Sequence, residues 1–328
     1  MPKKHSPRKG SMQFWPRKRA KKPYARVRSW AGIAEAAPLG FAGYKVGMTH
    51  ILINKAKTGG KSQVQRVFVP VSILECPPLK VYGVRAYRES ENGLKVATEV
   101  VVKADKELSR KTPGAKKETK KIDSLKPEDY SEFRLLVYTQ PKLTGIGKKK
   151  PEIFEIAIGG KPQEQFEYAK NVLGKEISIG DVFKEGEYVD VHGITKGKGV
   201  QGPLKRFGIK RTSHKSEKSV RTPGSLGGWV GQGVWMWRVA KAGHMGYNVR
   251  TEYNKWLLKI GKNPEEINVK GGFLHYGIVK NDYIIVKGSV QGTPKRLLKL
   301  TKAIRPDPKA PREVPPIHYV STESPQGK

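Results

Sequence analysis

Residues 197–202, Gly-Lys-Gly-Val-Gln-Gly, have the glycine spacing of a loop that binds a dinucleotide cofactor. That chemistry requires a helix that begins directly behind the glycines, with the pyrophosphate at its N-terminus. Pro203 and Gly208 prevent a proper helix from forming there. The glycines instead favour close approach of the backbone to phosphate groups, with Lys196 and Lys198 supplying positive charge.

The residue types that carry out catalysis or bind metals do not form a known pattern in this chain. The single cysteine, Cys76, permits neither an internal disulfide nor a cysteine-based zinc site and indicates an intracellular protein. The basic segments contain no pair of carboxylates for general acid–base work. We therefore predict no catalytic residue, no metal site, no cofactor and no small-molecule substrate. The histidines are scattered without an H-E-x-x-H motif, at His5, His50, His192, His214, His244, His275 and His318.

The net charge predicts a polyanionic partner. The chain has 64 Lys and Arg against 29 Asp and Glu, a formal net charge of +35, and a pI near 10.1. A membrane partner is disfavoured because the mean hydropathy is −0.58 and apolar runs such as 283–286 are far shorter than the ~20 residues of a spanning helix. The N-terminus also lacks the apolar stretch of a signal peptide, so we expect a cytoplasmic nucleic-acid-binding protein.

Two segments concentrate this charge. Residues 1–34 contain no acidic residue, and aromatic residues are interleaved with their Lys and Arg side chains. A solvated tail is the alternative, but the aromatic residues favour an arm that becomes ordered on its polyanion. Residues 195–250 contain twelve basic residues against Glu217 alone, many glycines and three closely spaced tryptophans. The tryptophans could form a small local cluster or stack on bases, and both readings remain open.

From these two segments we select the residues that we expect to contact RNA. They share a basic, aromatic or imidazole side chain in an acid-poor, Gly-rich or Pro-rich setting. They are Arg8, Lys9, Arg17, Lys18, Arg19, Lys196, Lys198, Lys205, Arg206, Lys210, Arg211, Arg221, Trp229, Arg238, Lys241 and His244.

The remaining sequence predicts a mainly β fold. Alternating or continuous apolar runs predict strands over 41–53, 64–74, 81–87, 94–102 and 188–194. Residues 162–173 have helical spacing with Gly174 as the stop, and 273–279 with 283–290 predict a hairpin that turns at 280–282. We expect a basic arm (1–40), one closed sheet (41–88, 176–199 and 246–305), an inserted α+β module (89–175), a basic loop (200–245) and a C-terminal tail (306–328).

Four segments resemble one known family in the same order along the chain. Phe41–His50, Thr195–Gly208, Lys241–Gly246 and Ile285–Val290 are similar to motifs of the L-three family of large-subunit ribosomal proteins. The basic arm, the Trp-bearing loop and the inserted module resemble its archaeal and eukaryotic members, and the short segment after the last strand favours the archaeal type.

The resemblance implies a closed six-stranded, antiparallel-type barrel like that of elongation factors, with long non-globular extensions. It also implies that the chain binds large-subunit rRNA near the 3′ end early in assembly, beside neighbouring ribosomal proteins. The loop would extend towards the peptidyl transferase centre, with Trp229 at its tip.

Two other functions were weighed. An RNA-modifying enzyme would need a cofactor loop or paired carboxylates, and the only glycine motif does not fit. A nucleic-acid packaging protein would bind duplexes without sequence preference, whereas three tryptophans on one basic loop suit a single folded RNA site.

Overall fold

The chain folds into two compact units, each built from segments that are distant in sequence. The computed structural model describes residues 8–56, 64–112, 122–224 and 239–324. Unit 1 combines residues 1–23 with 194–250, and unit 2 combines 24–193 with 251–328. Strands greatly outnumber helices, so the prediction of a mainly β chain is confirmed.

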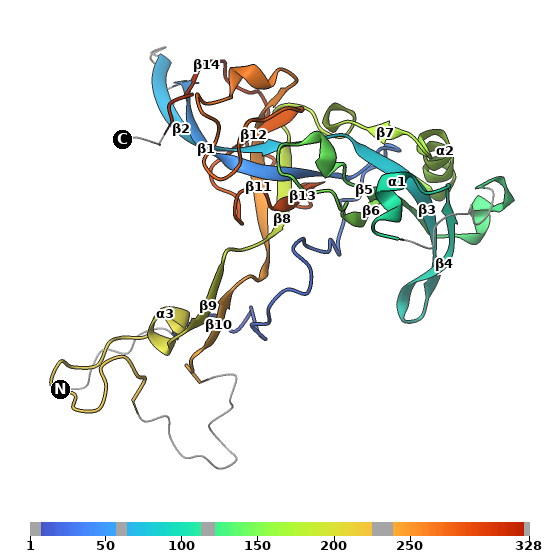
Figure 1. Cartoon of the computed structure of the whole chain (residues 1–328). Helices are drawn as coiled ribbons and strands as arrows, with labels where there is room; N and C mark the ends of the chain where they lie inside the picture. The colour runs from blue at the N-terminus through green and yellow to red at the C-terminus, as the bar shows by residue number, and fades with distance from the viewer. Residues whose placement is uncertain (1–7, 57–63, 113–121, 225–238, 325–328) are drawn as a thin grey trace. The chain divides into compact units, whose positions relative to one another are not determined.

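A seven-stranded sheet forms the first half of unit 2 (Figure 1). Its order is β13–β8–β11–β12–β2–β1–β14, and β13 also pairs with β1. Strands β8 and β11 flank unit 1 in the sequence, so the chain leaves this sheet at the end of β8 and returns to it along β11. The strands are β1 (Gly40–Ala56), β2 (Val64–Glu75), β8 (Tyr188–Ile194), β11 (Val249–Gly261), β12 (Tyr283–Lys287), β13 (Leu297–Lys302) and β14 (Ile317–Val320).

Strand β1 is long enough to pair with three partners. Its start pairs antiparallel with β13, from Gly40 opposite Thr301 to Tyr44 opposite Leu297. From Tyr44 onward it pairs antiparallel with β2, and the register shifts between Lys45 and Gly47. The shift marks a β-bulge, a local bend of the strand, close to where the pairing with β13 ends.

A five-stranded sheet forms the second half of unit 2. Its order is β4–β3–β5–β6, with the short β7 pairing with β3, and Figure 1 shows α2 near β7. The sequence groups residues 79–88 with the strands of the closed sheet, whereas the structure pairs β3 with β4, β5 and β7. The elements are β3 (Leu79–Ser90), β4 (Gly93–Val101), β5 (Glu132–Tyr138), β6 (Ile153–Ala157), β7 (Glu176–Ile177) and α2 (Pro162–Val172).

Helix α2 confirms the helix predicted from the sequence. At its first turn the Glu164 carboxylate accepts a hydrogen bond from the backbone N–H of Lys161 at 3.1 Å. Gly174, with a φ of +81°, follows the last turn. The buried Gln165 side chain accepts from the Phe133 N–H at 2.9 Å and so fastens the helix to β5.

One hydrophobic cluster runs through both sheets of unit 2. It includes fully buried residues of β1, β2 and β3 as well as of β5, β12 and β13. Trp256 of β11 belongs to it and donates its indole N–H to the carbonyl of Gly186 at 3.2 Å. Cys76 is buried in the same cluster, and burial raises the pKa of its thiol well above the ordinary value. This core positions β8 and β11, which lead into and out of unit 1.

The predicted hairpin over 273–290 is wrong in its first half. Residues 273–279 form a compact turn in which Phe273 and Gly277 make an isolated bridge, and only β12 is a strand. The buried carboxylate of Glu75 accepts hydrogen bonds from the Tyr276 hydroxyl and from the N–H groups of Lys280 and Asn281 at 2.9 and 3.0 Å. The two backbone bonds tie the turn residues that precede β12 to the end of β2.

The arm expected over 1–34 is also shorter than the sequence suggests. Tyr24, Ala25 and Val27 are buried in unit 2, where the Tyr24 hydroxyl donates to the carbonyl of Ile153 at 3.2 Å. The alternation of small and apolar residues at this point is strand-like but is masked by the surrounding charge. Residues 8–23 alone remain with unit 1.

The other described elements are short. Unit 1 contains β9 (Gly197–Gln201), α3 (Pro203–Phe207) and β10 (Gly243–Gly246). Unit 2 adds α1 (Lys106–Ser109) and five 3-10 turns at Ile122–Ser124, Pro127–Asp129, Pro141–Leu143, Ile179–Asp181 and Pro264–Glu266.

Candidate nucleic-acid interface

A two-stranded sheet forms the frame of unit 1. Strands β9 and β10 pair antiparallel, and the register shifts between His244 and Gly246 (Figure 1). Gly246 has a φ of +74°, and a Cβ at this position would lie 2.1 Å from the carbonyl oxygen of Lys196. Only glycine permits this close approach, which brings the following residues alongside the start of β9. The pairing continues as the N–H of Thr195 donates to the carbonyl of Asn248 at 3.0 Å.

Helix α3 follows the glycine motif of residues 197–202 but has only five residues. It begins at Pro203 and is terminated by Gly208 in the left-handed conformation, with a φ of +67°. The prediction that no proper helix opens behind these glycines is confirmed. The motif itself forms β9, whose residues are mostly exposed, so its backbone faces solvent rather than a cofactor cleft.

Hydrogen bonds to backbone carbonyls hold the arm segment 8–23 against this frame. Arg17 donates from Nη1 to the carbonyl of Arg206 at 2.7 Å, and the N–H of Ala20 donates to the carbonyl of Tyr247 at 2.9 Å. With its amide nitrogen turned towards both carbonyls, Asn248 donates to Gly246 at 3.0 Å and to Lys18 at 2.9 Å. The structure therefore joins the two segments that the sequence identified separately.

Aromatic packing adds to these contacts. The rings of Trp15 and Phe207 stack with their centroids 5.9 Å apart. The Arg17 guanidinium lies over both rings, 4.5 Å from the centroid of Phe207 and 5.3 Å from that of Trp15. Since Phe207 is 4% exposed, this cluster is the small hydrophobic core of unit 1.

The Arg206 side chain joins α3 to β10 and so completes the frame formed by β9, α3 and β10. Its Nε donates to the carbonyl of His244 at 2.9 Å, and its Nη1 donates to the carbonyl of Lys241 at 3.1 Å. A Cβ on Gly243 would lie 3.0 Å from the Arg206 Cζ, so the guanidinium is packed directly against β10. A residue chosen for RNA contact thus also stabilises the unit.

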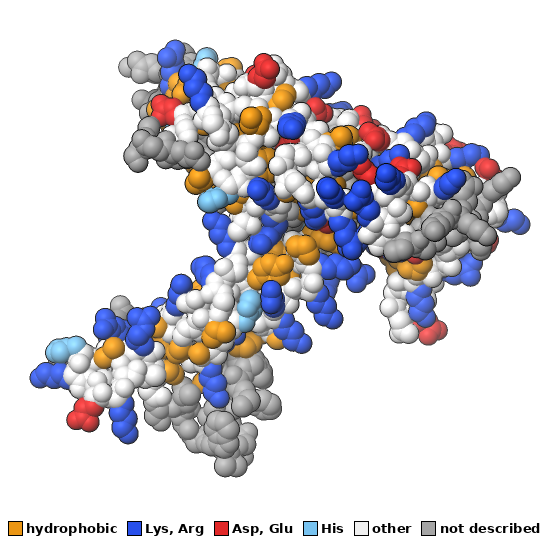
Figure 2. Space-filling view, in the orientation of Figure 1, with side chains coloured by type: hydrophobic (Ala, Val, Ile, Leu, Met, Phe, Trp, Pro, Cys, Tyr) orange, Lys and Arg blue, Asp and Glu red, His pale blue; other side chains and the backbone are white. Residues whose placement is uncertain are grey.

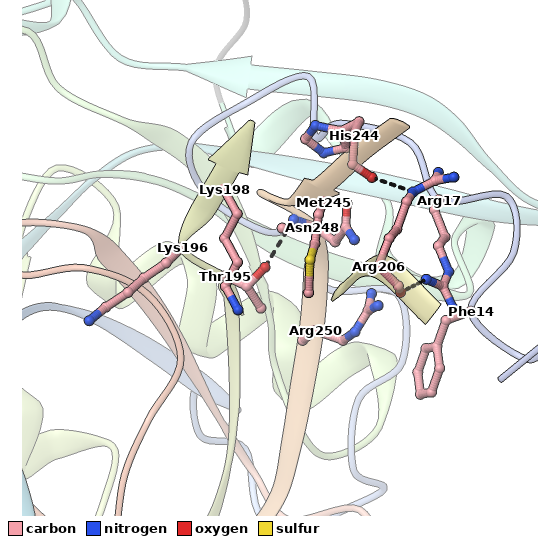
Figure 3. A pocket seen from close by; sticks show the side chains of 11 residues that line it. Phe14, Arg17, Thr195, Lys196, Lys198, Arg206, His244, Met245, Asn248 and Arg250 are labelled. Carbon is pink, nitrogen blue, oxygen red and sulfur yellow. Dashed lines mark hydrogen bonds between the residues drawn. The ribbon is translucent and has the colours of Figure 1, made fainter. Parts of the chain in front are cut away.

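These contacts leave a pocket of about 470 Å³ in unit 1. Figure 3 shows the guanidinium groups of Arg17 and Arg250 near Phe14 and that of Arg206 beside His244, with the side chains that precede and begin β9 on the opposite side. The wall combines positive charge with an exposed aromatic ring and a thioether. The residues that matter for its chemistry are Phe14, Arg17, Lys196, Lys198, Met245 and Arg250.

The electrostatics of unit 1 are strongly one-sided. Its sequence carries twenty-one Lys and Arg against one acidic residue, Glu217, so about a quarter of the residues carry +20 of the net +35. Figure 2 shows Lys and Arg spread over its visible surface. Burial, followed by the positive charges of Arg206, Arg250 and Arg8, lowers the pKa of Arg17. Burial also lowers the pKa of Arg250. An anion bound here would relieve this repulsion.

The structure brings fourteen of the sixteen predicted RNA-contacting residues into unit 1. Four of them are partly buried: Arg17, Arg206, Lys241 and His244. Trp229 and Arg238 lie outside the described residues. The other ten side chains are exposed: Arg8, Lys9, Lys18, Arg19, Lys196, Lys198, Lys205, Lys210, Arg211 and Arg221.

Phe14 and Arg250 are pocket residues that were not among the predicted contacts. Phe14 is 51% exposed, and the Arg250 guanidinium lies 4.4 Å from the centroid of its ring. The sequence contained a signal for both, because Phe14 is one of the arm aromatics and Arg250 is the last basic residue of the loop segment. Their proximity could not be deduced, because 236 positions separate them in the sequence.

Other kinds of site are not found in the described part of the chain. There, no three His, Cys, Asp or Glu side chains are placed to hold a metal ion. Of the helices in the described ranges, none is long and apolar enough to cross a membrane.

Comparison with known proteins identifies the family. The family model of Ribosomal protein L3 matches residues 1–327, which is nearly the whole chain. The chain belongs to the ribosomal protein L3 family. The L3-family motifs quoted from the sequence lie in β1, in β9 with α3, in β10 and at β12, so two of the four are in unit 1 and two are in the seven-stranded sheet.

Three archaeal relatives show how closely the chain follows this family. It is 49% identical to a protein of Methanosphaera stadtmanae over 340 aligned positions, which cover 100% of both chains. It is 50% identical to one of Methanocaldococcus jannaschii and 46% identical to one of Archaeoglobus fulgidus, with 98% and 99% of each chain covered. Each relative is named large ribosomal subunit protein uL3. The resemblance to the archaeal type of the L3 family is therefore confirmed.

Proposed function

We propose that this chain is a structural constituent of the large ribosomal subunit in the cytoplasm and binds large-subunit rRNA directly through unit 1. The observation that carries the proposal is the charge of that unit, +20 with a single carboxylate, on a folded frame that displays most of its cations to solvent. RNA is the polyanion that such a surface matches, since each basic side chain that meets a phosphate releases a counterion.

Most of the sixteen selected residues would fix the position of the RNA rather than read its bases. Lys196, Lys198 and Lys205 are exposed lysines, which bind phosphate as point charges without base specificity. The exposed backbone of β9 allows phosphates to approach its N–H groups as well. Trp229 and Arg238 belong to the same proposed surface, although they lie outside the described residues.

The proposal also assigns a role to each of the other parts of the chain. Strands β13, β8, β11, β12, β2 and β1 would form a closed six-stranded barrel, which is supported by the pairing of β13 with both β8 and β1. A closed barrel leaves no edge exposed and gives β8 and β11 rigid ends from which unit 1 extends. The loop over 200–245 would help to organise RNA near the peptidyl transferase centre. The barrel and the module over 89–175 would meet neighbouring ribosomal proteins, and the chain would join the rRNA early in assembly.

The two alternatives weighed from the sequence find no support in unit 1. An RNA-modifying enzyme needs a general base or a cofactor beside its substrate, and no carboxylate lines the pocket of unit 1. A packaging protein that binds any duplex has no use for a concave pocket with an exposed aromatic ring.

The first experiment measures where the chain is found and how salt acts on it. The full-length chain in a lysate should sediment with the large ribosomal subunit and remain there at high salt. In binding to purified large-subunit rRNA, the logarithm of the affinity should fall steeply with the logarithm of salt concentration, by about 0.7–0.9 for each phosphate contact.

Two matched sets of substitutions locate the surface. Replacing four exposed lysines of unit 1 by Gln should lower the salt slope by roughly 3, because four phosphate contacts are lost. Replacing four exposed lysines of unit 2 removes the same charge and should change the slope little. Equal losses in the two variants would show that total charge, rather than the surface of unit 1, determines binding. The sets are Lys196, Lys198, Lys205 and Lys210 in unit 1 and Lys95, Lys149, Lys150 and Lys309 in unit 2.

A further inference from the structure

We infer that the pocket of unit 1 receives one unstacked nucleotide of the bound RNA, with the base against Phe14 and the phosphate at Lys196 and Lys198. This inference rests on the proposed function and narrows it, because it names the form of RNA that this site accepts. A nucleotide displaced from a helix presents both a flat apolar face and a negative charge, and the pocket offers a surface for each.

Phe14 provides the stacking surface. Its side chain is 51% exposed although it lies in a concave pocket, and the Arg250 guanidinium lies over the ring, 4.4 Å from its centroid (Figure 3). Unpaired bases stack on aromatic rings and on guanidinium planes, whereas RNA duplexes are recognised through their backbone shape. An exposed ring in a cationic pocket therefore favours a base over a helical backbone.

The other aromatic rings near this pocket are already engaged within the unit. Trp15 and Phe207 stack on each other beneath Arg17, and Phe207 is almost fully buried. Tyr247 carries the Arg19 guanidinium 5.3 Å from its ring centroid. Phe14 also has a guanidinium over its ring, that of Arg250, but of these four aromatic side chains it is the one that is exposed to solvent.

The phosphate side of the pocket lies at the start of β9. Lys196 and Lys198 are exposed and lie on the opposite side of the pocket from Phe14; in Figure 3 the Lys198 side chain runs beside Thr195, whereas the Lys196 side chain extends away from the other pocket residues. Between them and the end of β9, Gly199 has a φ of +66°, and nothing lies within 4 Å of where its Cβ would be. The backbone is therefore open at this point, and a phosphate can approach it beside two lysines.

The pocket is already formed without RNA. Arg17 and Asn248 join the arm to β9 and β10 by the hydrogen bonds described above, and Arg206 holds β10 to α3. The volume of the pocket, about 470 Å³, falls within the range of about 300–1,000 Å³ that is usual for sites of small organic molecules. A preformed site avoids the entropy cost of ordering its walls on binding.

The test compares single-stranded with double-stranded RNA on the full-length chain. The probes are a fluorescein-labelled 12-nucleotide single strand of mixed sequence and the same strand annealed to its complement. Phe14→Ala should weaken binding of the single strand by about 5- to 150-fold, the loss expected for one stacked base. It should leave binding of the duplex and both salt slopes nearly unchanged, because no phosphate contact is removed.

Two further variants separate stacking from general damage. Phe14→Tyr keeps a flat ring and should restore binding of the single strand. Phe68→Ala removes a phenylalanine of unit 2 that is 65% exposed and should bind both probes like the unchanged chain. The double variant Lys196→Gln/Lys198→Gln should lower the single-strand salt slope by roughly 1.4, the contribution of two phosphates.

The possible failures are distinguishable. If the unchanged chain bound neither probe with a steep salt dependence, the proposed function itself would fail. If it bound steeply but Phe14→Ala matched it on the single strand, or weakened single strand and duplex equally, only the nucleotide pocket would be refuted. Failure of Phe14→Tyr to restore binding would likewise rule out stacking as the cause.

Discussion

Arg206 offers the sharpest test of how unit 1 is held together. Its guanidinium donates to the carbonyls of His244 and Lys241 at 2.9 and 3.1 Å, and its own carbonyl accepts from Arg17. Arg206→Ala removes the two side-chain bonds but leaves the backbone carbonyl in place. We therefore expect a selective loss of stability in the β9–α3–β10 frame.

The size of this loss follows from the geometry. A hydrogen bond from a charged donor contributes about 1.5–3 kcal/mol when buried. Arg206 is partly buried, so the lower part of that range applies to each of its two bonds. The expected destabilisation of the frame is roughly 2–4 kcal/mol, which accelerates amide exchange through local opening by about 30- to 800-fold.

Hydrogen exchange on the full-length chain measures this directly. The amides of Thr195 and Tyr247, which donate to Asn248 and Lys196, report on the frame. Amides of β2 in unit 2 serve as an internal reference and should keep their protection. Arg206→Lys retains the charge but cannot reach both carbonyls as a fork, so it should recover only part of the stability.

The matched control is Lys205→Ala, because Lys205 is the exposed neighbour on α3 and carries the same charge. Its substitution should leave exchange at Thr195 and Tyr247 unchanged. If Arg206→Ala accelerated exchange no more than Lys205→Ala, the two hydrogen bonds would contribute nothing and our account of the frame would be refuted.

Two other predictions concern unit 2. Glu75→Gln should lower the free energy of unfolding by about 1–3 kcal/mol in urea titrations, because an amide NH₂ replaces one of the oxygens that accept from surrounding donors. The control Glu91→Gln, at an exposed position, should leave the free energy of unfolding unchanged. Equal effects of the two substitutions would contradict the hydrogen-bond network around Glu75. Burial lowers the pKa of His192, which lies between the Thr251 and Thr301 hydroxyls. The unfolded chain then binds more protons, so stability should fall as pH drops from about 6.5 towards the lowered pKa. His192→Gln should flatten this dependence and His318→Gln should not, as unfolding at several pH values would reveal.

Local sequence patterns predicted about half of the helices and strands of unit 2, and gave no range for strands such as β5, β6, β11 and β13. Strand β1 and helix α2 followed from alternation, helical spacing and the glycine after the last turn, all of which act within a few residues. The turn over 273–279 could not be predicted in this way. Its apolar residues alternate as in a strand, but Phe273 and Gly277 bond to each other, and the Tyr276 hydroxyl donates to Glu75, about 200 positions earlier in the chain.

The basic residues of unit 1 could be selected by type from the sequence, but not their arrangement. Charge and the lack of acidic residues were enough to select Arg17 and Arg206, which share a hydrogen bond across 189 positions. Nothing local indicates that the arm lies beside β10, because this pairing is decided by tertiary contacts such as that of Ala20 with Tyr247. For the same reason, the exposed ring of Phe14 could be noticed in the sequence but not assigned to a pocket.

The shortage of carboxylates in unit 1 has a consequence for how salt acts on the protein. In the free chain, repulsion among cations opposes the folding of this unit, so added salt should tighten it by screening. In the presence of RNA, the same ions compete with the basic side chains for phosphate and weaken binding. Salt therefore drives the folding of this unit and its attachment to RNA in opposite directions. The ionic strength at which the chain joins its RNA most readily is an intermediate one, set by the balance of the two effects.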